Sequence, residues 1–348
     1  MAAAGGFTLP GADFTVHVHT AIDEVGPEWD ELMSAARAPV FYRRPFLRAF
    51  ELHPLHAVER AAYLLVLDAV GTPVAALPAY LQRGVDPMRV IADHFPRAAG
   101  QPALISHVWH CFDTVLPLRP GADDSAVRTA LDALEQLAAQ WGAHLWGLAN
   151  VDAATPLAQQ LTTRGLHPAD IDIGWGLDLT TLGHFDGYLA GLRGMPRRNL
   201  ARALRAADRA GVTVRTAAPA DADLDGFVTL ARATAAKYDN SDYYRPGLFQ
   251  DFVRALGDDA RVLELSITDR LICSALILTD DTRYHWWACG FAPMQDFSAF
   301  YVAFAHIMRG GFASERQWIE LGRRNPDFKR RYGLTPRTLR AWLTETPT

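Results

Sequence analysis

The sequence predicts an α/β (α+β) protein of two similar units in tandem, each a mixed, mainly antiparallel sheet flanked by helices. Three observations lead to this fold class. The chain has 348 residues, which is enough for two domains that each bury a core. Short apolar segments with the two-residue period of a strand alternate with segments of helical period along the whole chain. The order of elements in the first half recurs in the second half, although the residues themselves show no repeat.

The first half contains a strand at its start and a hairpin in its middle. Residues 14–20 alternate like a strand, and residues 61–82 form two apolar strands around a turn at 70–72. Asp123, Asp124 and Ser125 cap a helix that runs to Trp141, because such side chains accept hydrogen bonds from the first turn. The other segments of this half are helices at 27–37, 44–54 and 155–165 and strands at 107–118, 144–150 and 171–179.

The second half starts again with helices and continues with an antiparallel meander. A helix from 298 to 309 follows the meander and ends at the glycine pair 310–311. The strands of the meander are 260–268, 270–280 and 282–290. The other segments are helices at 185–193, 196–210, 221–237 and 248–256, strands at 212–217 and 317–322, and a basic tail. We therefore expect a first domain at 1–180 and a second domain at 181–348.

Composition disfavours several classes of protein. Hydrophobic residues make up 49% and charged residues 21% of the chain, as in a soluble globular protein. The first residues lack the basic and apolar regions of a signal peptide, and no segment is apolar enough to span a membrane, so we expect a cytoplasmic protein. The three cysteines show no CxxC spacing, which disfavours a disulfide framework or a zinc site.

The basic residues are unevenly distributed. Residues 1–180 carry 11 arginines against 20 acidic residues, whereas the remainder carries 23 basic against 19 acidic residues. A helical plot of 196–210 and its neighbours places four arginines on one stripe, and these are Arg198, Arg202, Arg205 and Arg209. Such a stripe either keeps a helix solvated or binds phosphates, to which the fork of the guanidinium group is suited. The second half is therefore where we expect an anionic partner.

Two segments of the second half resemble a known family. LRGMPRRNLARALRAADRAGVTVR (192–215) resembles the arginine-rich segment of Fem-type peptidyltransferases. FKRRYGL (328–334) is similar to the Phe-Lys-x-x-aromatic-Gly sequence that closes the same domain. The resemblance covers about residues 185–342 and extends to the Gcn5-related N-acetyltransferases (GNATs). It implies two GNAT-like domains and transfer of an acyl or aminoacyl group to an amine, and Fem-type enzymes take the amino acid from aminoacyl-tRNA.

The resemblance also bears on the donor. Simple acetyltransferases hold the CoA pyrophosphate on a Gln/Arg-x-x-Gly-x-Gly/Ala loop at a helix N-terminus. The matching segment is QDFSAF, in which Gln295 is present, Ser298 replaces the first glycine and Phe300 the last small residue. Phe300 either obstructs a pyrophosphate or packs in the core, and both readings weigh against ordinary CoA binding. With this resemblance, donor phosphates are expected to meet the stripe and the tail, namely Arg198, Arg202, Arg205, Arg209, Arg323, Arg324, Lys329, Arg330 and Arg331.

In an acetyltransferase-like fold the acyl group lies where two neighbouring strands diverge. Here these strands are expected at 284–289 and 317–321. His285 is a candidate general base, since histidine accepts protons near neutral pH, or else a hydrogen-bonded histidine of the sheet. Glu320 either orients the amine or pairs with an arginine of the tail. Strand alternation puts His285 and Trp287 on one face of the sheet.

The aromatic and polar loop YDNSDYYRPG (238–247) supplies further candidates. Asp242 is expected to accept a hydrogen bond from the ammonium group and Tyr244 to donate one to the leaving oxygen, which adds both to His285 and Glu320 as catalytic candidates. The alternative is that these side chains only fix a long loop, to which Asp239 also belongs. The residues expected to bind substrate are Lys237, Tyr243, Trp287 and Ser298.

These expectations combine into one function. We expect an amide-forming N-acyltransferase that moves an aminoacyl group from aminoacyl-tRNA to the amine of a small natural-product or cell-wall precursor. The alternative donor is an acyl-carrier protein or acyl-CoA, and the alternative of another class is a non-catalytic module that binds RNA or a ligand. No metal and no tightly bound cofactor are expected, because the acyl donor is itself the co-substrate. The expected partners are therefore tRNA or a carrier protein and a small amine.

Overall fold

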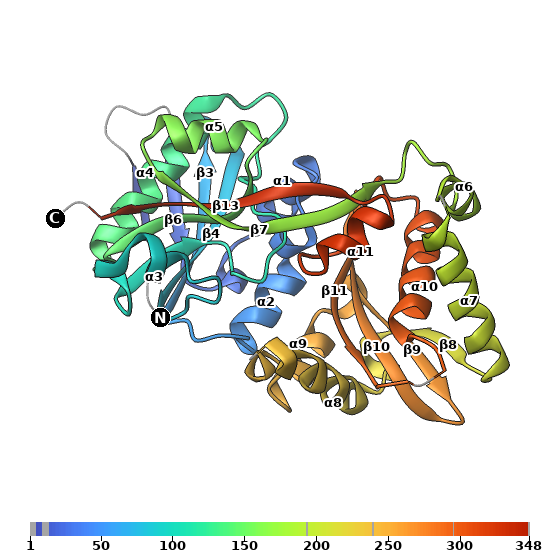
Figure 1. The fold of residues 1–348 in the computed structure, drawn as a ribbon. Helices are drawn as coiled ribbons and strands as arrows, with labels where there is room; N and C mark the ends of the chain where they lie inside the picture. Colours follow the sequence, from blue (N-terminus) through green and yellow to red (C-terminus); the bar gives the residue numbers. More distant parts are fainter. Residues whose placement is uncertain (1–4, 9–13, 193, 239, 295, 347–348) are drawn as a thin grey trace. The chain divides into compact units, whose positions relative to one another are not determined.

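The computed structural model of the chain describes residues 5–8, 14–192, 194–238, 240–294 and 296–346. The chain divides into two compact units, whose elements are labelled in Figure 1. Unit 1 contains Met1–Ile173 and Arg337–Thr348, and unit 2 contains Gly174–Pro336. The division lies a few residues before the boundary expected at 180–181, and the C-terminal residues group with unit 1.

Unit 1 is a mixed, mainly antiparallel sheet with helices packed on it (Figure 1). Its strand order is β1-β2-β3-β4-β5-β6-β13, in which β5 and β6 are parallel neighbours. The bounds of its elements are β1 Gly5–Thr8, β2 Thr15–His19, α1 Glu28–Ala35, α2 Arg44–Leu52, β3 Arg60–Leu67, β4 Pro73–Arg83, α3 Val90–His94, β5 Pro102–Ser106, α4 Asp124–Gln140, β6 Leu145–Asp152, α5 Pro156–Thr163 and β7 His167–Asp178, which continues into unit 2.

Helix α4 closes the main core of unit 1. As predicted, Asp123 caps this helix, and its carboxylate accepts a hydrogen bond from the Ser125 backbone N–H at 2.8 Å. The buried side of α4, which includes Leu134, shares a core with Val66 and Leu77 of the sheet. Each large aliphatic side chain buried in this way stabilises the fold by about 1.5–3 kcal/mol.

Unit 2 has the same plan, so the predicted fold class is confirmed. Its strand order is β7-β12-β11-β10-β9-β8, and β11 and β12 are the parallel neighbours. The bounds of its elements are α6 Phe185–Gly191, α7 Met195–Arg209, β8 Thr213–Ala217, α8 Leu224–Ala235, α9 Leu248–Ala255, β9 Ala260–Ile267, β10 Arg270–Thr279, β11 Arg283–Phe291, α10 Ala299–Ala313, β12 Trp318–Glu320, α11 Pro326–Arg331 and β13 Thr335–Glu345, which continues into unit 1.

Helices cover both faces of the sheet of unit 2. Helices α7 and α10 lie on one side and α8 and α9 on the other (Figure 1). Leu200 of α7 and Val302 of α10 belong to one core with Ile277 of β10. On the opposite face, Gly290 of β11 lies so close to α8 that an added Cβ would be 2.2 Å from the backbone nitrogen of Ala231. The sheet is therefore packed tightly from both sides.

One strand of each unit comes from a distant part of the sequence. Strand β7 follows the helices of unit 1, but its residues 176–178 pair antiparallel with β12 of unit 2. Strand β13 follows unit 2, but its residues 339–345 pair antiparallel with β6 of unit 1. Both strands take the same place, next to the second strand of a parallel pair. This exchange explains why residues 337–348 belong to unit 1 rather than to the second domain expected from the sequence.

The segment 107–118 forms a loop and not the predicted strand. The strand of this region is β5, which ends at Ser106. The apolar pattern of the loop reflects burial instead, since Trp109 and Cys111 are completely buried. The hydroxyl of Tyr42 fixes the loop, because it donates to the carbonyl oxygen of Val115 at 2.6 Å and accepts from the N–H of the same residue at 2.9 Å.

The sequence predicts that helix α10 ends at the glycine pair 310–311. In the structure the helix continues to Ala313. The two glycines allow close packing instead. An added Cβ would lie 2.5 Å from the hydroxyl of Tyr284 at Gly310 and 2.7 Å from Cδ1 of Ile319 at Gly311. They let α10 approach β11 and β12. The basic tail, to which the sequence assigned no element, contains α11 and the start of β13.

Candidate functional site

The parallel strands β11 and β12 diverge within unit 2. They pair over three positions, of which the last joins His285 to Glu320. Strand β12 ends there, whereas β11 continues to Phe291. After Glu320 the chain stays with β7, because the N–H of Leu321 donates to the carbonyl oxygen of Trp175 at 2.8 Å. The divergence therefore falls on the two segments expected from the sequence.

A β-bulge lies beside this point. Trp286 pairs with Ile277 of β10 and Ala288 pairs with Leu276, so Trp287 is an extra residue in β11. A bulge bends its strand and redirects the side chains beyond it. The bulge therefore accounts for the departure of β11 from β12 immediately after the last pair.

The two tryptophans of the bulge lie on opposite faces of the sheet, as predicted. Trp286 stacks on Phe300 of α10, with 5.6 Å between ring centroids. Trp287 stacks on Phe252 of α9 at 5.7 Å. Because side chains alternate along a strand, His285 lies on the same face as Trp287, toward α8 and α9.

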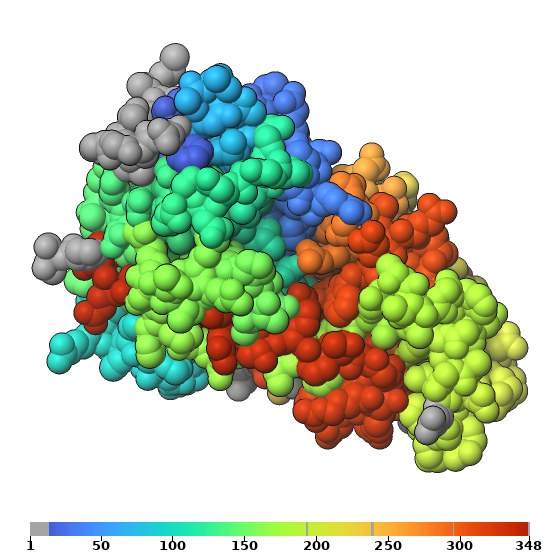
Figure 2. Space-filling view, turned by 90° about the horizontal axis from the view of Figure 1, so that it is seen from above, coloured from blue at the N-terminus to red at the C-terminus, as the bar shows by residue number. Residues whose placement is uncertain are grey.

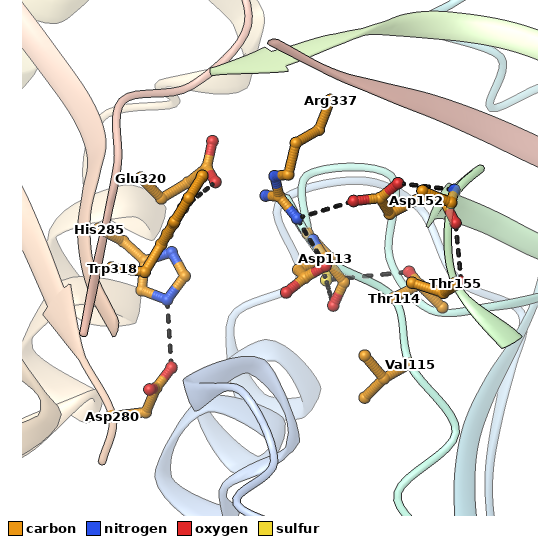
Figure 3. Close-up of polar contacts among 12 residues, drawn as sticks. Asp113, Thr114, Val115, Asp152, Thr155, Asp280, His285, Trp318, Glu320 and Arg337 are labelled. Atoms are coloured by element: carbon orange, nitrogen blue, oxygen red, sulfur yellow. Dashed lines mark hydrogen bonds and ion pairs between the residues drawn. The ribbon is translucent and has the colours of Figure 1, made fainter. Parts of the chain in front are cut away.

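His285 is completely buried, and its imidazole faces a carboxylate. Its Nε2 lies 3.2 Å from Oδ2 of Asp280 (Figure 3). The other oxygen, Oδ1, accepts hydrogen bonds from the N–H of Thr282 at 2.9 Å, its Oγ1–H at 3.1 Å and the N–H of Arg283 at 2.7 Å. The sequence indicated His285 but not Asp280, although the acidic residues that directly follow the strand in ILTDDT are the available signal.

Glu320 is also completely buried and lies opposite His285 in the strand register. Its Oε2 accepts a hydrogen bond from Nε1–H of Trp318 at 3.1 Å (Figure 3). The indole of Trp318 covers Gly176 of β7, where an added Cβ would lie 2.3 Å from the ring. The two predicted catalytic residues His285 and Glu320 therefore lie opposite each other on adjacent strands. Glycine at position 176 leaves the space that the indole of Trp318 occupies.

The predicted loop lies between α8 and α9, and its tyrosines approach β11. The ring centroid of Tyr243 lies 6.2 Å from that of Trp287 and 4.9 Å from that of Tyr244. Burial raises the pKa of both tyrosine hydroxyls, so both remain protonated donors at neutral pH. Asp242 and Lys237 are exposed on the same loop region.

The start of α10 lies in the segment that the sequence resemblance aligns with the CoA loop of simple acetyltransferases. Ser298 at the N-cap is exposed, and its side chain makes no capping hydrogen bond. The first turn of α10 contains no acidic residue. The ring of Phe300 packs against the core, which explains why an aromatic residue stands at this position. That Phe300 obstructs a pyrophosphate stays a prediction. Gln295, like Asp239 of the preceding loop, lies outside the described residues.

Aromatic rings pack between α10 and α11. Phe328 of α11 lies 4.7 Å from Phe300 and 5.0 Å from Phe304 of α10, measured between centroids. Tyr332 stacks on Phe328 at 4.3 Å, and its hydroxyl donates to the carbonyl oxygen of Pro196 at 3.0 Å. This aromatic cluster, Phe300, Phe304, Phe328 and Tyr332, therefore joins the start of α7 to α10 and α11.

The predicted arginine stripe of α7 is exposed. Leu200, Ala203 and Ala207 face the core, and the four arginines of the stripe lie on the solvent side, namely Arg198, Arg202, Arg205 and Arg209. Figure 2 shows the yellow-green segment of α6 and α7 at the surface beside the red C-terminal segment. Among the described residues, the stripe makes no ion pair, and its polar contact runs from Arg202 Nη2 to Asn199 Oδ1 at 3.5 Å.

The basic tail contains exposed and buried cations. Arg324, Arg330 and Arg331 are exposed, and Arg330 pairs with Asp327 at 3.3 Å. Lys329 is only 6% exposed and so is not part of the exposed basic surface. Burial raises the pKa of the Cys289 thiol to about 12, although the positive charge of Lys329 acts to lower this pKa. A contact of Lys329 with the donor stays a prediction, as does one of the half-buried Arg323.

Unit 1 holds a buried polar cluster that no local sequence pattern predicts. Nη1 of Arg337 lies 3.3 Å from Oδ1 of Asp113 and 3.5 Å from Oδ2 of Asp152 (Figure 3). Arg337 and Asp113 are separated by 224 residues, so no motif could join them. The arginine ties the exchanged strand β13 to β6 and to the loop 107–118.

Metal sites, membrane spans and disulfides are absent from the described part of the chain. No group of three or more histidine, cysteine or acidic side chains there is placed to hold a metal ion. No described helix combines the length and apolar character required to cross a bilayer. The three cysteines form no disulfide bond among the described residues.

Comparisons with known proteins find similar folds over nearly the whole chain. A family model described as "Acetyltransferase (GNAT) domain" matches residues 196–330, and no curated protein sequence matches. FemX is similar over 90% of this chain and 96% of that chain, with 10% identity and a TM-score of 0.65. The C-terminal domain of a protein named as a lysylphosphatidylglycerol synthetase, from Agrobacterium fabrum, is similar over 90% of each chain, with 12% identity and a TM-score of 0.56. A tandem GNAT protein from the clavulanic acid biosynthesis pathway is similar over 96% of this chain and 99% of that chain, with 16% identity and a TM-score of 0.56.

Proposed function

We propose that this chain, in which residues 196–330 match an acetyltransferase (GNAT) domain, is an acyltransferase that transfers an aminoacyl group from aminoacyl-tRNA to the amine of a small natural-product or cell-wall precursor. One observation carries the proposal. The exposed arginine stripe of α7 begins beside the aromatic cluster, in the same unit as the diverging strands β11 and β12. A donor that lies along the stripe would meet a surface suited to phosphates in the unit that holds the diverging strands.

The proposed reaction exchanges an ester for an amide. The amine nitrogen of the acceptor attacks the ester carbonyl carbon of the donor, so the C–N bond forms and the C–O bond to the terminal ribose breaks. His285 accepts the proton that the amine loses, and Tyr244 donates a proton to the leaving ribose oxygen. Backbone groups of β11 beyond its last pair with β12 are the proposed donors to the oxyanion.

The remaining predicted residues hold the substrates in this proposal. Glu320 and Asp242 orient the ammonium form of the acceptor before it loses its proton. Such positioning lowers the activation free energy, because the translational and rotational entropy of the reactants is already lost on binding. The residues proposed to contact the acceptor or the acyl group are Lys237, Tyr243, Trp287 and Ser298. Lys329 is also proposed to contact the donor. Because its side chain is buried, this contact would lie inside unit 2 and not at its surface.

Two features support tRNA over CoA as the donor. The arginines of the stripe make no ion pair among the described residues, so their charge is available to a polyanion. The aromatic cluster occupies the space between α10 and α11, and Phe300 belongs to it at the place where a CoA loop has a small residue. Because phosphate contacts hold a nucleic acid without reading its sequence, the stripe suits the acceptor arm of tRNA.

The start of α10 favours a second candidate donor. Its first turn has no acidic residue, and its N-cap side chain leaves the first N–H groups uncapped. Such a helix end attracts a phosphate group, including that of a phosphopantetheine arm. An acyl-carrier thioester is therefore the alternative donor within the same reaction class.

The proposal is tested with three donors that carry the same labelled acyl group. We would incubate the full-length protein and a panel of small amines with aminoacyl-tRNA, with the acyl-CoA and with the acyl-carrier thioester, and measure labelled amide. We expect amide from aminoacyl-tRNA alone, with a rate that falls as salt rises. Amide from a thioester alone would overturn the tRNA proposal. Salt-sensitive tRNA binding without amide from any donor would instead indicate a non-catalytic RNA-binding module.

A further inference from the structure

We propose that Asp280 is the positioning residue of His285 and holds the imidazole in the tautomer that carries its proton on Nε2. The inference rests on the proposed function, in which His285 accepts the proton of the acceptor amine. Both residues are buried, with exposed fractions of 1% for Asp280 and 0% for His285. Their facing atoms, Oδ2 and Nε2, lie 3.2 Å apart.

The hydrogen bonds at Asp280 define which partner donates. Its Oδ1 accepts three hydrogen bonds, two from backbone N–H groups and one from the hydroxyl of Thr282. Donors that converge on one oxygen favour the ionised carboxylate, which is an acceptor only. Oδ2 therefore accepts from Nε2–H of His285. The lone pair of the neutral imidazole is then on Nδ1, the nitrogen that receives the proton.

The place of Asp280 in the fold keeps this arrangement fixed. Asp280 follows β10, and its N–H donates to the carbonyl oxygen of Arg283 at 3.1 Å across the turn to β11. His285 is held from the other side by the pairing of β11 with Leu278 of β10 and with Glu320 of β12. The carboxylate and the imidazole therefore belong to one rigid hairpin.

The carboxylate has a second effect on proton transfer. When Nδ1 accepts the amine proton, the ring becomes an imidazolium, and the ionised Asp280 stabilises this charge through the existing hydrogen bond. One N–H bond breaks at the amine and one forms at Nδ1, while Nε2 keeps its own proton. After the amide has formed, the imidazolium loses this proton and Tyr244, which gave its own proton to the leaving oxygen, regains one, so both residues return to their starting forms.

The variant Asp280→Asn tests the inference with little change in shape. The amide oxygen can take the place of Oδ1 beneath the two backbone N–H groups, which turns the amide NH2 toward His285. The ring must then accept at Nε2 and carry its proton on Nδ1. We expect kcat to fall by about 10²–10⁴-fold, as when a histidine base is held in the wrong tautomer, with the KM for both substrates within about twofold.

The tautomer itself is read from full-length protein labelled with ¹⁵N-histidine, by long-range ¹H–¹⁵N correlation of the ring. We expect the wild-type His285 signal to show a protonated Nε2 and the Asp280→Asn signal a protonated Nδ1. Thr282→Val is the matched control, because it removes one hydrogen bond from Oδ1 and leaves Oδ2 facing His285. It should keep the wild-type tautomer and kcat.

The outcomes separate this inference from the proposed function. A wild-type ring protonated on Nδ1 would overturn the inference without any variant, and so would an unchanged tautomer in Asp280→Asn. A switched tautomer with kcat lowered supports both. A switched tautomer with wild-type kcat supports the positioning by Asp280 and refutes the role of His285 as the base in the proposed function.

Discussion

Units 1 and 2 share one plan but differ beyond the ends of their parallel strands. In unit 1, β5 ends at Ser106, and the loop 107–118 takes up the position beyond it. This loop is anchored to β6, because the N–H of Thr114 donates to the carbonyl oxygen of Asn150 at 3.1 Å. In unit 2, β11 continues past its last pair with β12 as a bulged strand. This region is therefore packed in unit 1, whereas in unit 2 it is the place where we propose the chemistry.

The two buried histidines near these points show the same difference. In unit 1, Nε2 of His107 donates to the carbonyl oxygen of Phe41 at 2.7 Å, and Nδ1 accepts from the N–H of Val108 at 2.6 Å. Burial lowers the pKa of His107 to about 4, so the ring stays neutral. His285 of unit 2 faces the carboxylate of Asp280 instead, with 3.2 Å between Nε2 and Oδ2. The partner of the imidazole therefore distinguishes a packing histidine from a candidate base.

The helices between the parallel strands differ as well. At the start of helix α4 of unit 1, the carboxylate of Asp123 accepts hydrogen bonds from the hydroxyl and the backbone N–H of Ser125, and these hold the pKa of Asp123 below its ordinary value. Helix α10 of unit 2 begins with Ser298 and has no side-chain cap. A negative charge at the start of α4 repels an anion, whereas the start of α10 attracts one. The donor is thus expected at unit 2.

The largest predicted effect is at the two histidines. His285→Gln should lower kcat for amide formation by about 10²–10⁴-fold, because a general base is lost. His107→Gln should lower the free energy of unfolding and leave kcat per folded molecule unchanged. Steady-state kinetics on samples whose folded fraction is measured by circular dichroism would check both. Equal loss of kcat in the two variants would erase the distinction between the units.

The second prediction concerns the pH dependence of stability. The pKa of His107 is about 4 in the folded state and 6.5 when exposed, so the unfolded chain binds the proton first as pH falls. Stability is therefore unaffected above pH 6.5 and is lost between pH 6.5 and 4, by about 3 kcal/mol in full and about 2 kcal/mol at pH 5. Urea unfolding at pH 7 and pH 5 should show this loss in the wild type but not in His107→Gln. A parallel loss in both proteins would contradict it.

The third prediction compares exposed arginines of the two units. Replacing the four stripe arginines by glutamine should weaken tRNA binding by about ten- to a hundredfold near 0.1 M salt and reduce the salt slope by about 3. The matched control replaces exposed arginines of unit 1, and these are Arg48, Arg83, Arg89 and Arg128. Three of them already pair with carboxylates, at 3.3, 2.9 and 3.3 Å. Fluorescence anisotropy with uncharged tRNA measures both, and a similar loss in the control would show that only net charge matters.

The smallest predicted effect concerns the two helix starts. Asp123→Ala removes a capping hydrogen bond and should lower the Tm by about 2–4 °C. Ser298→Ala removes no capping bond and should leave the Tm unchanged. Differential scanning calorimetry compares the variants. A larger shift for Ser298→Ala would mean that its hydroxyl stabilises α10 in a way that the structure does not contain.

Features set by neighbouring residues could be predicted from the sequence. The Asp123 cap, the hairpin of β3 and β4 and the amphipathic α7 each depend on side chains within one or two turns or strands, and all three are confirmed. The prediction of a strand at 107–118 is wrong because its apolar residues are buried in a loop, in which only Leu118 forms a bridge to a described residue, Ala75. The prediction of a helix end at glycines 310–311 is wrong because close packing of a helix on a sheet uses the same residue type.

Features set by distant parts of the chain could not be predicted. The exchange of β7 and β13 and the contact of Arg337 with Asp113 depend on pairing between residues far apart in sequence. Burial of Lys329, which lies between the buried Phe328 and the exposed Arg330, depends on the packing of α11. The site shows both cases, since the divergence of β11 from β12 was predicted from a family resemblance, whereas the contact of Asp280 with His285 depends on the geometry of the turn.

The central claim is that unit 2, and not unit 1, receives the acyl end of the donor. Photo-cross-linking tests it most directly, with an aminoacyl-tRNA whose amino acid carries a benzophenone group, followed by peptide mapping of the full-length protein. The account predicts cross-links within residues 284–334, and their loss when unlabelled aminoacyl-tRNA competes. Cross-links confined to residues 14–173 would contradict it.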